Sequence, residues 1–286
     1  MRILLLGGGY VLSRLAEQLD TQQFVISSRS TDKIKEFRSK GWEAVSLDIS
    51  HKNSTKDFFT EQPAFDLIID SVPPFHSAES SMSQKTLGVK NVISALVDLN
   101  KIPSRLFYLS TTGVYGKENG EIVNENSTTT PLSARGEARL ASEKLYSEVA
   151  AKSDCQLTCF RIAAISGPER NPVSSIKAGR YPLIEDGARY TNRIHVEDLV
   201  RVLYQAINYK EILPSAINCS SGKSYPAIQM LEYLAAKYDL DLPESVSLEE
   251  IKARGWGTML SNQQVSNKLL VDLFPDAIQF SDLTWM

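Results

Sequence analysis

The sequence predicts an α/β fold in which a doubly wound parallel sheet occupies the first part of the chain and a small α/β lobe follows it. Two observations predict this fold. Short apolar segments alternate with amphipathic segments through the first two-thirds of the chain, and a glycine cluster follows the first apolar segment. Strands that alternate with helices through short connections form a parallel sheet with helices on both faces. After residue 163 the alternation loosens, because Gly and Pro pairs become frequent.

The expected elements of the sheet follow from local patterns. Residues 3–6 are an uninterrupted apolar run, as in a strand that is covered on both faces. Similar runs predict the further strands 24–27, 43–47, 66–70, 105–110 and 157–162. Amphipathic stretches predict the helices 10–19, 31–40, 53–60, 79–99 and 134–152.

The C-terminal part is expected to be a smaller lobe. Its patterns predict a helix near 195–208, a short strand at 216–219, and helices near 225–238 and 247–254. We expect a dinucleotide-binding domain over residues 1–165, onto which residues 190–215 pack back, and a substrate-binding lobe over 166–286. Because ligands of open α/β sheets bind at the carboxyl ends of the strands, a cleft is expected there.

The composition excludes several kinds of protein. The 31 Lys and Arg residues against 34 Asp and Glu residues give a net charge of −3, which argues against nucleic acid as the main ligand. No apolar stretch has the length of a transmembrane helix, and the first strand leaves no room for a signal peptide, so we expect a cytoplasmic protein without a membrane partner. The three cysteines form no C-x-x-C pair and the three histidines are scattered, so neither a metal site nor a disulfide framework is expected.

The glycine cluster predicts a binding site for a dinucleotide pyrophosphate. Gly7 allows a tight turn after the first strand, and Gly9 lets the backbone approach a phosphate. The helix that begins near Tyr10 and Val11 directs backbone N–H groups and its positive dipole end toward the anion. The third position of the G-x-G-x-x-G pattern is Leu12, so helix and strand are expected to pack less closely. The alternative is an ordinary glycine-rich turn between a strand and a helix.

The ends of the following strands predict which dinucleotide binds. Arg29 follows the second strand, where an acidic residue bonds the ribose 2′-hydroxyl of NAD and an arginine accommodates the 2′-phosphate of NADP. NADP is therefore expected in preference to NAD, unless Arg29 is a solvated loop residue. Asp48, after the third strand, either bonds the adenine amine or caps the following turn. Ser71, after the fourth strand, is also expected to contact the cofactor.

Four motifs follow in order along the chain. They are the run Ser110-Thr111-Thr112-Gly113-Val114-Tyr115-Gly116, the Pro131 segment with its helix, Arg161 with Gly167 and Pro168, and the run Arg193-Ile194-His195-Val196-Glu197-Asp198. With the N-terminal glycines, these motifs resemble the extended short-chain dehydrogenase/reductases, the group of nucleoside-sugar epimerases and dehydratases, over nearly the whole chain. The resemblance implies a Rossmann-type domain that binds NAD or NADP.

The same resemblance implies roles for particular residues. Thr111 lies four residues before Tyr115, at the position that polarises the substrate carbonyl or hydroxyl in relatives, and a hydroxyl can donate to a developing oxyanion. The alternative is that Ser110, Thr111 and Thr112 satisfy backbone groups at the strand end. Asn91 matches a helix asparagine that supports the site of relatives through a bound water.

The chain departs from its relatives on the next helix. Relatives place a Tyr-x-x-x-Lys pair there, whereas this chain has Arg135 and Arg139. An arginine stays protonated and cannot act as an ordinary proton shuttle. Arg139 can still bond ribose hydroxyls and Arg135 can grip an anionic substrate, so we expect both to face the cleft; the alternative is a surface row with Glu143 at i, i+4 spacing. This loss resembles the atypical extended members, including the bacterial YeeZ-like proteins, for which dinucleotide binding is implied without a settled reaction.

Another acid would have to replace the missing tyrosine. Tyr115 is the best candidate, although without a lysine nearby its pKa should stay high, and in many relatives this tyrosine only packs and forms a substrate wall. His76, in the loop after the fourth strand, is a further candidate acid or base, and the alternative is an exposed loop histidine. His195 is expected to be a hydrogen-bonded scaffold residue, and Arg193 a contact to the substrate or between the lobes.

Two classes of function fit this sequence. One is an oxidoreductase or epimerase that acts on a small polar or anionic substrate with Thr111 as oxyanion donor. The other is a non-catalytic dinucleotide-binding protein that senses redox state. The retained Thr111 and Tyr115 favour the enzyme, whereas Arg135 and Arg139 favour the sensor. A homodimer is compatible with either class.

Overall fold

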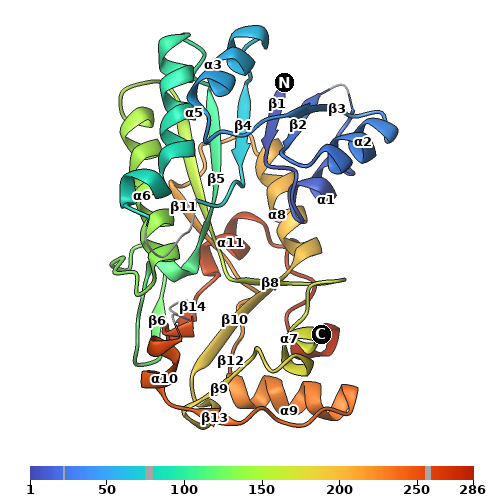
Figure 1. Ribbon diagram of the computed structural model, residues 1–286, viewed down its shortest axis with the longest axis vertical. Helices are drawn as coiled ribbons and strands as arrows, with labels where there is room; N and C mark the ends of the chain where they lie inside the picture. The colour runs from blue at the N-terminus through green and yellow to red at the C-terminus, as the bar shows by residue number, and fades with distance from the viewer. Residues whose placement is uncertain (22, 75–79, 255–258) are drawn as a thin grey trace. The chain divides into compact units, whose positions relative to one another are not determined.

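The computed structural model describes residues 1–286 apart from 22, 75–79 and 255–258 (Figure 1). The chain forms two compact units, and neither is a continuous stretch of sequence. The first unit contains Met1–Ser110, Ala138–Phe160 and Leu203–Ala216, and the second contains Thr111–Glu137, Arg161–Val202 and Ile217–Met286. The expected boundary after residue 165 between a dinucleotide-binding domain and a substrate-binding lobe stays a prediction.

A seven-stranded sheet has the strand order β11-β7-β5-β4-β1-β2-β3. Its strands are β1 Ile3–Leu6, β2 Phe24–Ser28, β3 Glu43–Ser46, β4 Leu67–Asp70, β5 Arg105–Thr111, β7 Gln156–Ile162 and β11 Ala216–Cys219. β1 pairs in parallel with both β2 and β4, so the chain winds outward from β1 in two directions. This is the doubly wound parallel sheet that the sequence predicts, and the fold class is confirmed.

The sheet of the first unit is buried on both faces. All four residues of β1 are fully buried. Leu4 and Leu6 of β1 pack in one core cluster with side chains of α3 (Lys52–Glu61) and α5 (Leu87–Asp98). Other helices of this part of the chain are α1 Leu12–Ala16, α2 Thr31–Ser39 and α6 Ala134–Ala150. Because both faces are covered, the ends of the strands are where side chains can reach a ligand.

The helix expected at 79–99 is divided in the structure. It consists of α4 (Met82–Lys85) and α5, which begins at Leu87. α4 starts with a capping box, in which the Ser81 hydroxyl accepts from the backbone N–H of Gln84 and the Gln84 side chain accepts from the backbone N–H of Ser81. Capping side chains determine where a helix begins independently of the apolar period, which is why periodicity alone did not predict this start.

The second unit contains small sheets that the sequence did not predict. A three-stranded sheet consists of β8 Ala164–Ser166, β10 Tyr190–His195 and β12 Ser224–Pro226, in which β10 is parallel to β8 and antiparallel to β12. Two-stranded parallel sheets pair β9 Leu183–Ile184 with β13 Ser245–Val246, and β6 Glu121–Val123 with β14 Gln263–Val265. Most of these strands are two or three residues long, which is too short for an alternating pattern to show.

The helices expected near 195–208, 225–238 and 247–254 are observed as α8 Val196–Asn208, which belongs to both units, α9 Ala227–Tyr238 and α10 Leu248–Ala253. The second unit also contains α7 Val173–Lys177 and α11 Lys268–Leu273, which the sequence did not predict. Met230, Leu231 and Leu234 of α9 lie in the core cluster of this unit. Among the residues that the structure describes, no helix is both long enough and apolar enough to span a bilayer.

Candidate functional site

The turn after β1 has a geometry that requires glycine at one position and leaves space at another. Gly7 has a φ of 92°, and a Cβ there would lie 2.9 Å from Cγ2 of Val72 and 3.0 Å from Oγ of Ser71. A Cβ at Gly9, by contrast, would meet only the carbonyl oxygen of Gly7, at 3.9 Å. The backbone is therefore closely packed at Gly7 and open at Gly9.

Ser71 holds this turn in place. Its hydroxyl donates to the carbonyl oxygen of Gly7 (2.7 Å), and its backbone N–H donates to the carbonyl oxygen of Leu6 (3.0 Å). On the other side, the backbone N–H of Gly7 donates to Oγ of Ser27 (3.0 Å). The structure thus brings Ser71 next to the glycine turn. Its hydroxyl is engaged with the turn itself.

The residues between the turn and α1 differ in how they pack against their neighbours. Gly8, to which sequence reasoning gave no role, is packed so that a Cβ would lie 2.6 Å from the ring of Phe37. Val11 is buried, whereas the ring of Tyr10 lies 4.0 Å from the guanidinium carbon of Arg14. Val11, the N-cap residue of α1, forms no side-chain cap hydrogen bond among the described residues.

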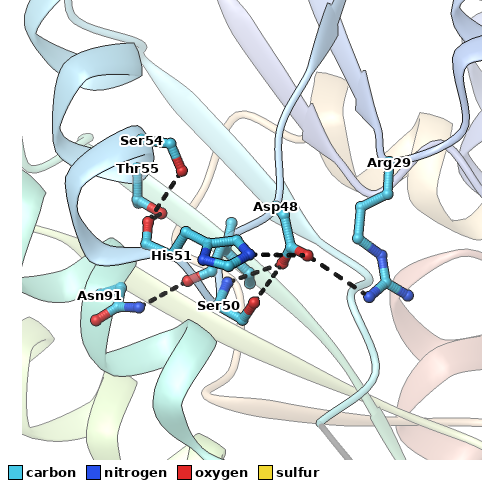
Figure 2. A network of polar contacts seen from close by, with 8 residues as sticks. Arg29, Asp48, Ser50, His51, Ser54, Thr55 and Asn91 are labelled. Carbon is cyan, nitrogen blue, oxygen red and sulfur yellow. Dashed lines mark hydrogen bonds and ion pairs between the residues drawn. The ribbon is translucent and has the colours of Figure 1, made fainter.

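Arg29 and Asp48 meet at the ends of β2 and β3 (Figure 2). The two strands pair in parallel up to Ser28 and Ser46, and the Arg29 Nη1 atom lies 3.9 Å from Oδ2 of Asp48. Asp48 also caps the turn before α3, since the backbone N–H and the hydroxyl of Ser50 both donate to its Oδ1 (2.9 and 2.8 Å). The turn-capping alternative for Asp48 is therefore observed.

The carboxyl of Asp48 is held as an anion. Burial by itself would raise its pKa, but the hydrogen bonds from Ser50 and the neighbouring Arg29 and His51 side chains outweigh burial, so the pKa lies below its usual value. The Nε2 atom of His51 lies 4.0 Å from Oδ2 of Asp48. Asn91 donates through Nδ2 to the carbonyl oxygen of Ile49 (2.8 Å). Its expected support of the site through a bound water stays a prediction.

Arg139 lies among the ends of β4 and β5. Its Nη1 atom donates to the carbonyl oxygen of Leu109 (2.8 Å), the hydroxyl of Tyr108 (3.1 Å) and the carbonyl oxygen of Val72 (3.3 Å). The residue is only 6% exposed. Within the described part of the chain, the hydrogen bonds of this guanidinium all involve Nη1, so Nη2 and Nε keep donors for a ligand.

A buried carboxyl lies in the same region. Tyr146 donates its hydroxyl to Oδ2 of Asp70 (2.7 Å), and the backbone N–H of Val72 donates to Oδ1 (2.9 Å). Burial raises the pKa of Asp70, and the hydrogen bonds together with the charge of Arg139 oppose it only in part. Burial likewise raises the pKa of Tyr108, to about 12. Sequence reasoning missed this network, because each member lies in a segment that reads as ordinary core.

The row of side chains on α6 is not a surface row. Glu143 is buried and accepts from the hydroxyl of Ser110 (2.5 Å), and Arg139 is buried as described. Arg135, by contrast, is exposed. The two arginines therefore differ in burial, although their i, i+4 spacing places them on one side of the helix. The expectation that both face a cleft stays a prediction.

Thr111 and Tyr115 differ in what their hydroxyl groups can do. Thr111 Oγ1 accepts from the backbone N–H of Gly113 (3.2 Å), and no described residue accepts its hydroxyl hydrogen. Tyr115 is fully buried; its hydroxyl donates to Oδ1 of Asn218 (2.7 Å) and accepts from Nη1 of Arg161 (3.1 Å). Burial raises the pKa of Tyr115 against the effect of Arg161. Thr111 is thus free to donate, whereas Tyr115 is committed to neighbours.

Arg193 is a cation with neutral partners. Its guanidinium donates to the hydroxyls of Ser166 (2.7 Å) and Tyr181 (3.2 Å) and contacts the sulfur of Met230 (3.1 Å). No carboxylate of the described residues forms an ion pair with it. An anionic ligand would therefore find an uncompensated charge in the second unit.

Of the two histidines to which the sequence analysis gave a role, the structure describes only His195. His195 accepts from the backbone N–H of Glu197 through Nδ1 (3.2 Å), and its ring centre lies 4.0 Å from that of Phe280, as expected of a scaffold residue. His76 lies outside the described residues. Within the described residues, no cluster of three or more His, Cys, Asp or Glu side chains is arranged to hold a metal ion.

Comparison with known proteins gives a consistent family. Residues 3–220 match the model of the NAD dependent epimerase/dehydratase family. A UDP-glucose 4-epimerase of Mycoplasma genitalium is 23% identical over 199 residues, which is 59% of this chain and 57% of that protein. The chain thus spans little more than half the length of this curated relative.

Solved structures match over nearly the whole chain. A conserved protein of unknown function from Silicibacter pomeroyi is 25% identical with a TM-score of 0.74, covering 99% of this chain and 95% of the other. A UDP-glucose-4-epimerase of Stenotrophomonas maltophila, solved with NAD and formylated UDP-arabinopyranose, has a TM-score of 0.78 at 18% identity, covering 100% and 95%. The second likeness concerns the fold alone. Since the family model covers most of its residues, this chain belongs to the NAD dependent epimerase/dehydratase family.

Proposed function

We propose that the protein binds a nicotinamide dinucleotide at the carboxyl ends of β1, β2 and β4 and uses it in an oxidoreductase or epimerase reaction on a small polar or anionic substrate. The observation that carries the proposal is the glycine turn. Gly7 is closed by packing and Gly9 is open, so the chain leaves space where a pyrophosphate would meet the backbone. When bound, the dinucleotide supplies a centre that accepts or donates a hydride.

Each part of the dinucleotide has candidate partners in the first unit. The backbone of Gly9, Tyr10 and Val11 would hold the pyrophosphate. The guanidinium of Arg29 would hold a 2′-phosphate, which favours NADP over NAD. Arg139, with Nη2 and Nε available, would donate to ribose hydroxyls.

Calorimetric titration with NADP and NAD tests the cofactor assignment. Arg29→Ala should weaken NADP binding on the order of tenfold and leave NAD binding nearly unchanged, because only NADP carries the phosphate that Arg29 would bind. Lys35→Ala is the matched control, since it removes an exposed positive charge from the neighbouring α2. The assignment is wrong if NAD binds more tightly than NADP to the wild type, or if Arg29→Ala keeps the preference.

Different residues of this chain are proposed to polarise, enclose and hold the substrate. The free hydroxyl hydrogen of Thr111 would stabilise a developing oxyanion. Tyr115 would form a rigid wall, in keeping with its two buried hydrogen bonds. Arg193, which lacks an ion-pair partner among the described residues, and the exposed Arg135 are candidates for holding an anionic group of the substrate.

Turnover assays test this second part of the proposal. Nucleotide sugars are the first class to try, because solved relatives such as the Stenotrophomonas maltophila enzyme hold a UDP-sugar. With an active substrate, Thr111→Val should lower kcat on the order of a hundredfold, and Thr111→Ser should restore most of the rate. The redox-sensor alternative gains no support from the comparisons. Saturable cofactor binding without turnover over a broad substrate panel would nevertheless count against the enzyme.

A further inference from the structure

The carboxylate of Asp48 lies beside the guanidinium of Arg29, the group that is proposed to receive a 2′-phosphate. Figure 2 shows the two side chains reaching toward each other from the ends of neighbouring strands. Their closest charged atoms, Nη1 of Arg29 and Oδ2 of Asp48, are 3.9 Å apart. The Arg29 side chain is 71% exposed, so this is a surface ion pair that an incoming ligand can displace.

Asp48 cannot easily turn away from that position. Its Oδ1 accepts two hydrogen bonds from Ser50, which hold that oxygen in place. The segment that follows is held in turn, because Asn91 donates to the carbonyl oxygen of Ile49 and the hydroxyl of Thr55 donates to that of His51 (2.9 Å). The lowered pKa keeps the group negatively charged at neutral pH. Arg29 therefore faces a fixed negative charge.

We infer that Asp48 is a specificity-determining residue that limits the preference for NADP by competing with its 2′-phosphate for Arg29. The inference rests on the proposed role of Arg29. A 2′-phosphate must displace the Asp48 carboxylate and then stand near its negative charge. The 2′-hydroxyl of NAD is neutral, so it neither displaces the carboxylate nor is repelled by it. Asp48 therefore lowers the affinity for NADP and leaves the affinity for NAD almost unchanged.

A different role for Asp48 makes a different prediction. If its carboxylate bonds the adenine amine, removal of the charge weakens every adenine-containing ligand by the same factor. The test therefore uses two fragments, 2′,5′-ADP and 5′-AMP, which share the adenine and differ in the 2′-phosphate. Their ratio of dissociation constants reports the phosphate alone.

The experiment measures that ratio by calorimetry for the wild type and Asp48→Asn. Asparagine keeps an oxygen that can accept from Ser50, so the turn should persist, and thermal unfolding checks this. We expect the affinity for 2′,5′-ADP to rise about three- to tenfold relative to 5′-AMP. Asp98→Asn is the control, because Asp98, at the end of α5, is an exposed aspartate that forms an ion pair with Lys56 (3.3 Å) away from Arg29. It should leave the ratio unchanged.

The Arg29→Ala background separates this inference from the proposed function. Because Asp48 acts by competing for Arg29, its substitution should change the ratio much less when Arg29 is absent, which a double-mutant cycle measures. The inference is overturned if Asp48→Asn leaves the ratio of dissociation constants unchanged or weakens both fragments equally. It is also overturned if Asp48→Asn changes the ratio by the same factor with and without Arg29. If Arg29→Ala alone leaves the ratio of the wild type intact, the proposed role of Arg29 fails instead.

Discussion

Two arginines lie at the carboxyl ends of strands in the first unit, and they differ in how far they are exposed to water. Arg29 is exposed and pairs with one carboxylate at 3.9 Å, whereas Arg139 is buried and donates to three oxygen atoms of the strand ends. Water screens the first pair, so it contributes little to folding and is free to respond to a ligand. The second cannot be removed without leaving buried oxygen atoms unpaired. Exposure thus separates an arginine that contributes little to folding from one that satisfies buried oxygen atoms.

The largest effect on folding is expected at Arg139. Arg139→Met should lower the free energy of unfolding by about 3 kcal/mol, because the buried carbonyl oxygen of Leu109 and its neighbours lose their donor. Urea unfolding of the wild type and the variant measures the change. A loss below about 1 kcal/mol would mean that water replaces the guanidinium and that the network is not as closed as its burial indicates.

The buried carboxyl of Asp70 should make stability depend on pH. Its pKa in the folded state is raised above the ordinary value of 3.8, so the folded protein holds a proton that the unfolded chain releases. The stabilisation that comes from this retained proton is fully present below pH 3.8 and is lost as the pH rises through the pKa of Asp70 in the folded state. The stability of the wild type relative to Asp70→Asn should therefore fall with rising pH, by at most about 1.4 kcal/mol per unit. A difference that stays constant or grows with pH would contradict this sign.

The buried hydroxyl of Tyr115 should contribute more to the free energy of unfolding than to the rate of the proposed reaction. Tyr115→Phe leaves Oδ1 of Asn218 without its donor and should lower the free energy of unfolding by about 1–2 kcal/mol. If Tyr115 only forms a wall, kcat at a given substrate should stay within about tenfold of the wild type. A loss of kcat as large as that of Thr111→Val, together with a changed pH profile of kcat, would assign Tyr115 to the chemistry.

The smallest effect on folding is expected at Arg29. Arg29→Ala should change the free energy of unfolding by less than about 0.5 kcal/mol, since its ion pair is exposed to water. The same urea titration that is used for Arg139→Met gives this value. A loss of more than about 1 kcal/mol would remove the contrast between the two arginines.

The sequence predicts the sheet well and the environment of side chains poorly. Apolar runs place β1 and β5 nearly at their observed bounds, because a strand that is buried on both faces needs an unbroken apolar segment. The spacing of Arg135 and Arg139 indicates a shared side of a helix, but it does not say that Arg139 is buried while Arg135 is exposed. Likewise, the partner of Asn91 is a carbonyl oxygen 42 positions away, which no local pattern reveals. Tertiary contacts decide such cases.

Gly9→Ala tests the central claim, that a dinucleotide binds at the turn after β1, most directly. A methyl group there meets only a carbonyl oxygen at 3.9 Å, so the folded protein should accept it with an unchanged melting temperature. The same methyl group would fill the space that a pyrophosphate needs, so the account predicts that NADP and NAD both bind more weakly, on the order of tenfold, in calorimetric titration. Wild-type affinity for both dinucleotides in a fully folded Gly9→Ala variant would contradict the account.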